Sequence, residues 1–403
     1  MSTVADRTSA PLALNGGPPV RATLLPYAHQ TVEEADVQAV VDVLRSDWLT
    51  TGPQVAAFEA AFAAQIAARD AVAVSSGTAA LHVAACAVGI KPGDEVIVPP
   101  MTFAASANCV GYQGGTVVFA DVRPDTLTLD PACVVAAISP RTRAIITVDY
   151  AGQPSDLDEL SAIAERHGLL LIEDAAHALG ATYRGRPVGG LAHVTTFSLH
   201  AVKPITSGEG GVLTTNDPAL AARLRLFRSH GITRDAHERE VAGSWCYQMV
   251  ALGYNYRLTD VQCALAKAQL ARLQEGLARR RQIAARYTQA LRDLEAVEPL
   301  TVLPDRDSAW HLYVVRLRVE RLRVGRDEVF RALRAENIGV NVHYIPVPWH
   351  PYYQRLGYRC GQWPVAEAAH ERLLSLPLWA GMREGDVQDV IDAVHKVVHH
   401  VGR

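Results

Sequence analysis

The sequence contains no long apolar run and no segment that resembles a targeting signal. No stretch of its 403 residues approaches the roughly 18 consecutive apolar residues of a membrane-spanning helix. The first 24 residues lack the charged and then apolar order of a secretory signal peptide. We therefore predict a cytoplasmic protein without a membrane partner, in which residues 1–24 form a disordered leader.

Paired cysteines and blocks of charge are also missing. The six cysteines contain no CxxC pair, which is typical of reduced, packed thiols and argues against a disulfide framework or a zinc site. They are Cys86, Cys109, Cys133, Cys246, Cys263 and Cys360. The net charge is -3, and there is no basic block or tail that would suit a nucleic acid. We predict no metal site and no nucleic-acid partner.

The composition, with 49% apolar and 20% charged residues, is that of a soluble globular enzyme. Short apolar runs alternate with amphipathic segments over the first two thirds of the chain. The patterns predict strands at 71–74, 95–98, 117–120, 144–148, 169–172, 194–199 and 211–215. They predict helices at 31–46, 54–67, 78–88, from about 103, and at 156–167. This order predicts an α/β fold with a mostly parallel sheet flanked by helices.

The last third of the chain has a different pattern. Residues 258–291 read as two consecutive helices, followed by a strand at 311–319, a helix at 326–336, a strand at 339–345 and a helix at 384–399. We predict a large domain over residues 25–270. A linker helix and a smaller α+β C-terminal domain then occupy residues 271–403.

One lysine lies in an unusual setting. The stretch Phe197 to Gly211 reads FSLHAVKPITSGEGG, in which Lys203 precedes a proline and therefore avoids the α region. Burial lowers the pKa of a lysine and makes its amine a usable nucleophile, as Schiff-base enzymes require. The alternative is a surface lysine in a turn, and the residues of this stretch do not decide between the two.

Two further motifs lie where predicted strands end. Ser75 to Leu81 (SSGTAAL) joins a strand to a helix whose first amides could hold a phosphate, although the same residues could simply cap the helix. Asp174 directly follows the apolar run at 169–172, so it lies at the carboxyl end of the sheet, where open α/β sheets bind ligands. A carboxylate there could keep the ring nitrogen of a cofactor protonated or could face a helix N-terminus. Glu173 points to the other side of the strand and is interpreted as structural.

A phosphate seat, a strand-end aspartate and a lysine with a nearby serine are together what pyridoxal 5′-phosphate (PLP) needs. From about Leu25 to near the C-terminus the sequence resembles the DegT/StrS-type sugar-nucleotide aminotransferases, within the fold-type-I PLP enzymes. The resemblance implies that Lys203 forms the imine with PLP and moves the proton. It also implies that Asp174 pairs with the pyridinium nitrogen and that His177 approaches the ring oxygen.

The resemblance assigns roles to other positions too. Gly77, Thr78 and Ser198 bind the phosphate, and Phe103 in PPMTFAASANC stacks on the cofactor ring. Asn255 in LGYNYRLTDVQ reaches the phosphate of the neighbouring subunit, which requires a homodimer. Near the sugar-nucleotide pocket lie Tyr27, His311, His343 and Tyr344. Each has a plainer alternative: Phe103 as core, Asn255 as a turn cap, His177 as a satisfied buried histidine, and His343 and Tyr344 as strand-edge packing.

The reaction implied is a transamination with L-glutamate as the amino donor. HAVKPITSGEGG, VDYAG at 148–152 and SHGIT at 229–233 look closest to the branch that aminates UDP-4-keto-6-deoxy-N-acetylhexosamines, the branch of the pseudaminic-acid pathway. A dTDP-linked keto sugar or a keto-cyclitol of an antibiotic pathway stays open as the acceptor. A PLP-binding regulator without catalysis is the alternative of another class. The intact set of Lys203, Asp174 and Ser198 speaks against it.

Overall fold

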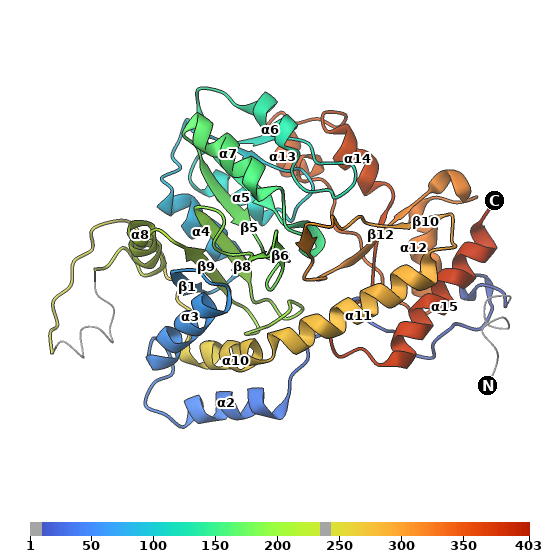
Figure 1. Cartoon of the computed structure of the whole chain (residues 1–403), viewed down its shortest axis with the longest axis horizontal. Coiled ribbons are helices and arrows are strands. Elements are labelled where there is room, and N and C mark those ends of the chain that lie inside the picture. The colour runs from blue at the N-terminus through green and yellow to red at the C-terminus, as the bar shows by residue number, and fades with distance from the viewer. Residues whose placement is uncertain (1–9, 234–242) are drawn as a thin grey trace.

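The computed structural model describes residues 10–233 and 243–403. A large sheet with helices on both faces is joined by helix α11 (Leu273–Leu291) to a smaller C-terminal part (Figure 1). Within those residues, no helix is both long enough and apolar enough to cross a bilayer.

The large sheet has seven strands in the order β1-β9-β8-β5-β4-β2-β3. They are β1 (Asp70–Val74), β2 (Glu95–Val98), β3 (Thr116–Phe119), β4 (Thr142–Val148), β5 (Leu170–Asp174), β8 (Val194–Ser198) and β9 (Gly211–Thr215). All neighbouring pairs are parallel except those of β9, which runs antiparallel to both β1 and β8. The predicted mostly parallel sheet is thus confirmed, and each predicted strand appears within three residues of its expected ends.

Helices cover both faces of this sheet, as its almost continuous apolar strands require. One face packs against α4 (Gly77–Ala87), α5 (Ala105–Tyr112) and α8 (Pro218–Arg228). The other packs against α3 (Pro53–Gln65) and α10 (Asp260–Ala271) at one end and against α6 (Pro131–Ala137) and α7 (Leu157–His167) at the other. Helix α2 (Glu34–Leu44) lies outside α10 (Figure 1). The sequence patterns did not predict α6 and α8.

The C-terminal part is built on the antiparallel sheet β10-β12-β13 (Val297–Pro299, Tyr313–Leu317 and Leu373–Leu376). Its core is closed by α11, α12 (Arg326–Ala335) and α15 (Glu384–Val401). The short helices α13 (Pro351–Arg355) and α14 (Pro364–His370) pack back on the large sheet. A third small sheet joins β6 (Thr182–Tyr183), β7 (Arg186–Pro187) and β11 (Arg306–Asp307).

The predicted strand at 339–345 is wrong. Only Asn341 forms a bridge there, with Ser375 at the edge of β13, and the residues after it turn away from the sheet. The alternating pattern GVNVHYI suits a strand, but a strand also needs a continuous partner. The structure instead places His343 and Tyr344 on the wall of a cavity.

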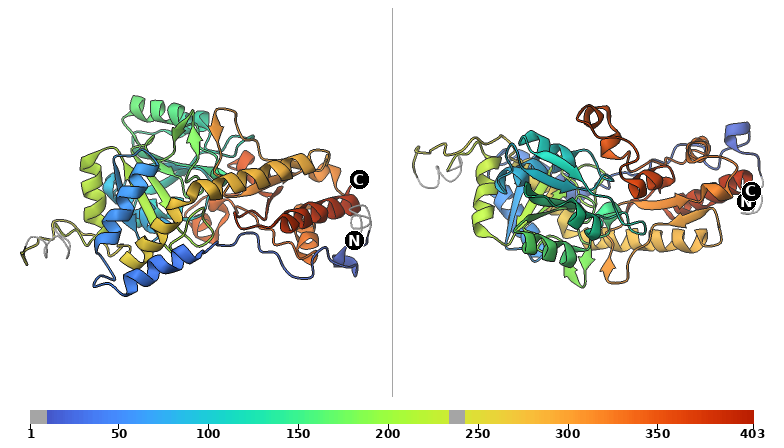
Figure 2. Two further views of the ribbon diagram at one scale, coloured as in Figure 1. Left: turned by 60° about the horizontal axis from the view of Figure 1, so that its bottom comes forward. Right: turned by 90° about the horizontal axis from the view of Figure 1, so that it is seen from above.

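The predicted disordered leader needs a correction for residues 10–24, whereas residues 1–9 lie outside the described residues. Leu12 is buried in the C-terminal core, and the amides of Ala13 and Val20 both donate to the buried carboxylate of Glu336 at 2.9 Å. Lys396 donates to the same carboxylate at 2.9 Å. The segment therefore runs along the C-terminal part before it reaches α2 (Figure 2, left). Because these partners lie more than 300 residues away, the local sequence carried no signal of them.

Candidate active site

A cavity of about 540 Å³ opens at the carboxyl ends of β4, β5 and β8, next to the C-terminal part. It is lined by every residue that the sequence singled out for a site except Asn255. These are Tyr27, Gly77, Thr78, Phe103, Asp174, His177, Ser198, Lys203, His311, His343 and Tyr344. Seven separate stretches of chain thus converge on one cavity, at the sheet edge where open α/β folds place their ligands.

One wall of the cavity is the N-terminus of helix α4. Ser76 caps this helix, since its hydroxyl accepts from the amide of Ala79 at 3.0 Å. The amides of Gly77 and Thr78 find no acceptor within residues 10–233 and 243–403, so they are free for an anion. A side chain at Gly77 would bring its Cβ within 2.9 Å of the Ser198 Cβ. Glycine is therefore needed for Ser198, at the end of β8, to share this anion seat.

Asp174 is buried on the cavity floor as the last residue of β5. The Ser106 hydroxyl donates to its Oδ2 at 2.6 Å, and the Ala176 amide donates to its Oδ1 at 3.2 Å. Burial raises the pKa of Asp174, while Ser106, the Ala176 amide and Lys203 act in the opposite direction. Sequence reasoning missed Ser106. Its signal was a hydroxyl three residues after Phe103, one helical turn further along the same stretch.

Lys203 reaches the cavity from the loop after β8. Its Nζ donates to Nε2 of His311 at 3.3 Å. Burial lowers the pKa of Lys203 to about 8, with Asp174 opposing and Arg280 adding to the decrease. Its amine therefore loses its proton, and becomes nucleophilic, much closer to neutral pH than the amine of an ordinary lysine. The other three lysines of the chain lie elsewhere: Lys91 and Lys267 are exposed, and Lys396 is paired with Glu336.

Three buried histidines, His177, His311 and His343, line the same cavity. The ring of His177 lies 4.4 Å from that of His311, and His177 Nε2 is 3.0 Å from the hydroxyl of Tyr344. His343 is 2.7 Å from the Ser375 hydroxyl through Nδ1. Burial holds the pKa values of His177 and His311 well below their ordinary value and lowers that of His343 to about 4. All three rings are therefore neutral at neutral pH, and the buried Nδ1 of His177 is left without a partner for a bound group to use.

The remaining predicted residues lie at the rim. The side chain of Phe103 is 60% exposed, so it does not belong to the core, and its ring lies 6.1 Å from that of Tyr344. Tyr27 packs its ring 5.6 Å from that of His343. Asn255 does not line the cavity of its own chain, and its backbone forms a bridge with Ser229, the residue that follows α8.

Known proteins resemble this chain over most of its length. The family model described as the DegT/DnrJ/EryC1/StrS aminotransferase family matches residues 30–395. The chain belongs to this family. Among curated proteins it is 44% identical over 377 residues, 93% of this chain and 97% of the relative, to the spore coat polysaccharide biosynthesis protein SpsC of Bacillus subtilis.

Solved structures of this family share the whole fold. Spr1654 from Streptococcus pneumoniae in its PLP form has a TM-score of 0.88 and 32% identity, covering 94% of this chain and all of that one. PseC from Helicobacter pylori, an aminotransferase involved in the biosynthesis of pseudoaminic acid, has a TM-score of 0.87 and 30% identity with the same coverage. The fold-type-I architecture and membership of a PLP-dependent sugar aminotransferase family are thus established.

The residues present fit PLP. The cradle at Gly77 and Ser198 offers free amides and a hydroxyl to a phosphate. Asp174 offers a buried carboxylate to a ring nitrogen, the free Nδ1 of His177 can meet a polar ring substituent, and Lys203 offers the amine. One cavity therefore offers a chemically matched group to each of these four parts of the cofactor.

A buried pair of carboxyl groups lies behind Asp174. Glu173, on the opposite face of β5, accepts from the Thr195 hydroxyl at 2.7 Å, and Asp149 accepts from the Ser155 amide at 2.9 Å. Burial raises the pKa of Glu173 to about 7 and holds that of Asp149 well above its ordinary range, with each affecting the other. The two groups therefore share a proton at neutral pH. Glu173 does not line the cavity, and its structural role stays a prediction.

This pair predicts a pH dependence of stability. Its folded-state pKa values lie above the unfolded ones, so its contribution is present at low pH and is lost as pH rises through about 7. We expect Glu173→Gln, whose amide replaces the shared proton, to flatten the pH dependence by about 2 kcal/mol of unfolding free energy between about pH 5 and pH 9. Denaturant unfolding of the cofactor-free protein measures this. Glu165→Gln, a change at an exposed position of α7, should keep the wild-type slope, and a slope unchanged by Glu173→Gln would contradict the assignment.

Proposed function

We propose that the protein transaminates a nucleotide-linked 4-keto-6-deoxy sugar, a UDP-4-keto-6-deoxy-N-acetylhexosamine, with L-glutamate as the amino donor. The observation that carries the proposal is the convergence of Lys203, Asp174 and the N-terminus of α4 on one cavity within a PLP-dependent sugar aminotransferase family. An aminotransferase needs all three together, whereas a binding protein needs no buried lysine with a lowered pKa.

Each residue of the site has a separate role in the proposed reaction. When bound, PLP supplies an electron sink that delocalises the charge left at the reacting carbon. Asp174 would hold positive charge at the ring nitrogen of PLP, and the amides of Gly77 and Thr78 with the Ser198 hydroxyl would hold its phosphate. The Lys203 amine would take up and return the proton at the reacting carbon as general base and acid. The neutral His311 accepts from Nζ and so orients this amine.

The acceptor is inferred from two relatives and from the sequence. PseC is an aminotransferase involved in pseudoaminic acid biosynthesis, and SpsC is a spore coat polysaccharide biosynthesis protein. The runs at 148–152, 199–211 and 229–233 resemble the branch that acts on UDP-4-keto-6-deoxy-N-acetylhexosamines. Tyr27, Phe103, His343 and Tyr344, which all line the cavity, would give the sugar an aromatic and hydrogen-bonding surface beside Lys203.

A homodimer with a shared active site belongs to the proposal. Large apolar residues are exposed in the segment 243–252, which projects from the large domain (Figure 1). Their exposed fractions are 88% for Trp245, 78% for Leu252 and 66% for Met249. Contiguous exposure of this kind marks a contact surface. Asn255 follows this segment closely in the chain and lies outside the cavity of its own chain. This position suits the role of reaching the cofactor phosphate bound by the neighbouring subunit.

A single-turnover experiment tests the function. Protein loaded with PLP is treated with L-glutamate until the absorbance of the lysine-bound cofactor disappears, and the excess donor is removed. UDP-4-keto-6-deoxy-N-acetylhexosamines, a dTDP-4-keto-6-deoxy sugar and a keto-inositol are then offered separately. We expect the absorbance to return with the UDP sugar. Return only with another acceptor contradicts the assigned substrate, and no return with any of them contradicts the proposed class of reaction.

A further inference from the structure

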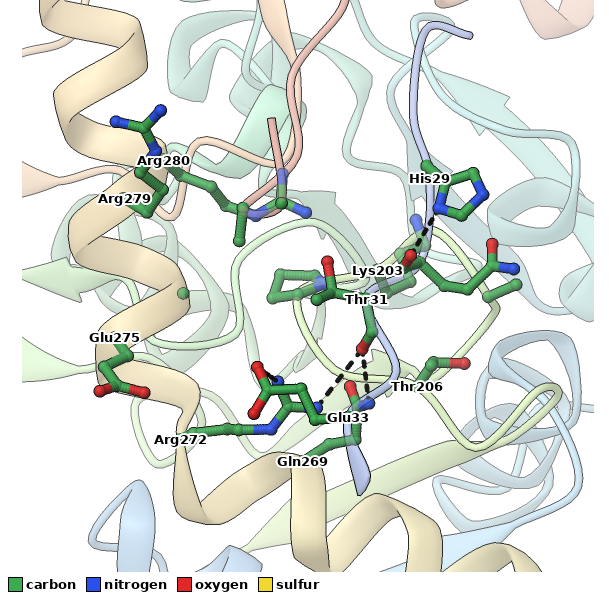
Figure 3. Close-up of a pocket in the computed structure, with 16 residues that line it drawn as sticks. His29, Thr31, Glu33, Lys203, Thr206, Gln269, Arg272, Glu275, Arg279 and Arg280 are labelled. Carbon is green, nitrogen blue, oxygen red and sulfur yellow. Dashed lines mark hydrogen bonds and ion pairs between the residues drawn. The ribbon is translucent and has the colours of Figure 1, made fainter. Parts of the chain in front are cut away.

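A second, smaller cavity of about 240 Å³ lies beside Lys203 (Figure 3). Lys203 lines both cavities, so the two adjoin at this residue. The second cavity lies between the loop after Lys203, the start of α11 and the segment at 29–33. Its wall contains the arginines Arg272, Arg279 and Arg280, whereas the lining of the larger cavity contains none.

Two of these arginines are already neutralised. Arg272 pairs with Glu33 at 2.7 Å and also with Asp36. Arg279 pairs with Glu384 at 2.7 Å and donates to the Met382 carbonyl at 2.9 Å. Of the acidic side chains on the wall, Glu33 is taken by Arg272, and Glu275 is exposed.

Arg280 differs from its neighbours. It is only 3% exposed, and its Nη1 donates to the carbonyls of Trp310, His311 and Leu378 at 3.2, 3.5 and 3.1 Å. It forms no ion pair with a carboxylate among residues 10–233 and 243–403, and burial alone lowers its pKa to about 10. Burying a guanidinium with only neutral partners costs free energy. An anionic ligand that pairs with Arg280 would lower this cost, because the described residues supply no carboxylate there.

We propose that Arg280 receives the distal carboxylate of a dicarboxylic amino donor whose amino group reacts beside Lys203. This inference rests on the proposed function, since it places one substrate of that same site. The donor must bring both an amine and a carboxylate next to Lys203, and Arg280 is the cation beside Lys203 that lacks a carboxylate. Because Lys203 lines both cavities, a donor whose amine lies beside Lys203 in the larger cavity would extend its distal carboxylate toward Arg280 in the smaller one.

The recognition has a chemical consequence. L-Glutamine has nearly the shape of L-glutamate but lacks the distal charge. A comparison of the two donors therefore measures how much the charged contact with Arg280 contributes to binding. A charge-assisted hydrogen bond to a buried guanidinium discriminates strongly against a ligand that cannot form it. The wild-type protein should therefore prefer glutamate, and glutarate, which carries the carboxylates without an amine, should bind as an unreactive probe.

The test compares Arg280→Gln with Arg279→Gln. Arg279→Gln removes a charge from the same helix and the same cavity wall, but this charge is already paired with Glu384. For Arg280→Gln we expect KM for glutamate to rise and glutarate affinity to fall by at least about tenfold, with little change for glutamine. Arg279→Gln should leave the preference for glutamate intact. Arg280→Lys, which keeps the charge, should restore part of it.

Three readouts separate the outcomes. Thermal unfolding of each variant reports on folding, and calorimetry with glutarate reports on binding without turnover. Equal losses for glutamate and glutamine in Arg280→Gln contradict the proposal, because they indicate a structural effect through the three carbonyls. Unchanged glutarate affinity contradicts it too. Protein loaded with pyridoxamine phosphate and offered the keto sugar tests the proposed function separately, since that half-reaction requires no amino donor.

Discussion

Replacing Lys203 by alanine is expected to reduce transamination by more than about 10³-fold, because in the proposed mechanism Lys203 is both the nucleophile that holds the cofactor and the group that moves the proton. The variant should still bind PLP through Asp174 and the anion seat at Gly77, Thr78 and Ser198. Turnover with glutamate and a keto sugar measures the first effect. Equilibrium dialysis against PLP measures the second.

Two control variants sharpen this result. Lys203→Arg keeps the positive charge but supplies no amine for the cofactor, so it should be as inactive as the alanine variant. Lys267→Ala removes an amine from the exposed side of α10 and should retain the wild-type rate. A Lys203→Ala variant that turns over within a few-fold of the wild type would show that another group performs the proton transfer.

Replacing Asp174 by asparagine is expected to lower the turnover rate by at least about 100-fold while the fold is kept. Asparagine can still accept from Ser106, but it carries no charge to hold a proton on the cofactor ring. The reacting carbon then loses its electron sink. Steady-state turnover and the absorbance spectrum of the loaded protein measure the effect, since the spectrum reports the protonation state of the ring.

The neighbouring residue supplies the matched control. Glu173→Gln removes a buried carboxyl one residue away, but on the opposite face of β5 and with Thr195 and Asp149 as its surroundings. It should change the pH dependence of stability and leave the turnover rate near that of the wild type. If Glu173→Gln lowered the activity as much as Asp174→Asn, both losses would come from the change of a buried carboxyl group near the site. They would then not come from the loss of charge at the ring nitrogen.

The sequence predicted those parts of the fold that are set locally. Each strand of the large sheet is a short apolar run, and each sits between helices, so periodicity and composition were sufficient. Asp174 and the turn at Gly77 could be placed at the sheet edge for the same reason, because both directly follow such runs. The structure places these residues and Lys203 in one cavity.

The features that the sequence did not reveal depend on contacts between distant segments. Ser106 matters because its hydroxyl meets Asp174, 68 residues away, and Arg280 is of interest because helix α11 brings it to the cavity that Lys203 also lines. The alternating pattern at 339–345 resembles a strand, yet the backbone there finds one bridge partner only. Residues 10–24 have the Gly and Pro content of a loop, but Glu336 and the C-terminal core hold them. No local pattern encodes such partners.

Reduction of the PLP-loaded protein with borohydride, followed by digestion and mass spectrometry, tests the central claim most directly. The chain contains four lysines, Lys91, Lys203, Lys267 and Lys396, so the position of the label is unambiguous. The account predicts a phosphopyridoxyl group on Lys203 alone. It also predicts that capture of PLP by the cofactor-free protein becomes faster as pH rises through about 8, where the amine of Lys203 loses its proton. Labelling of another lysine, or none at Lys203, would contradict it.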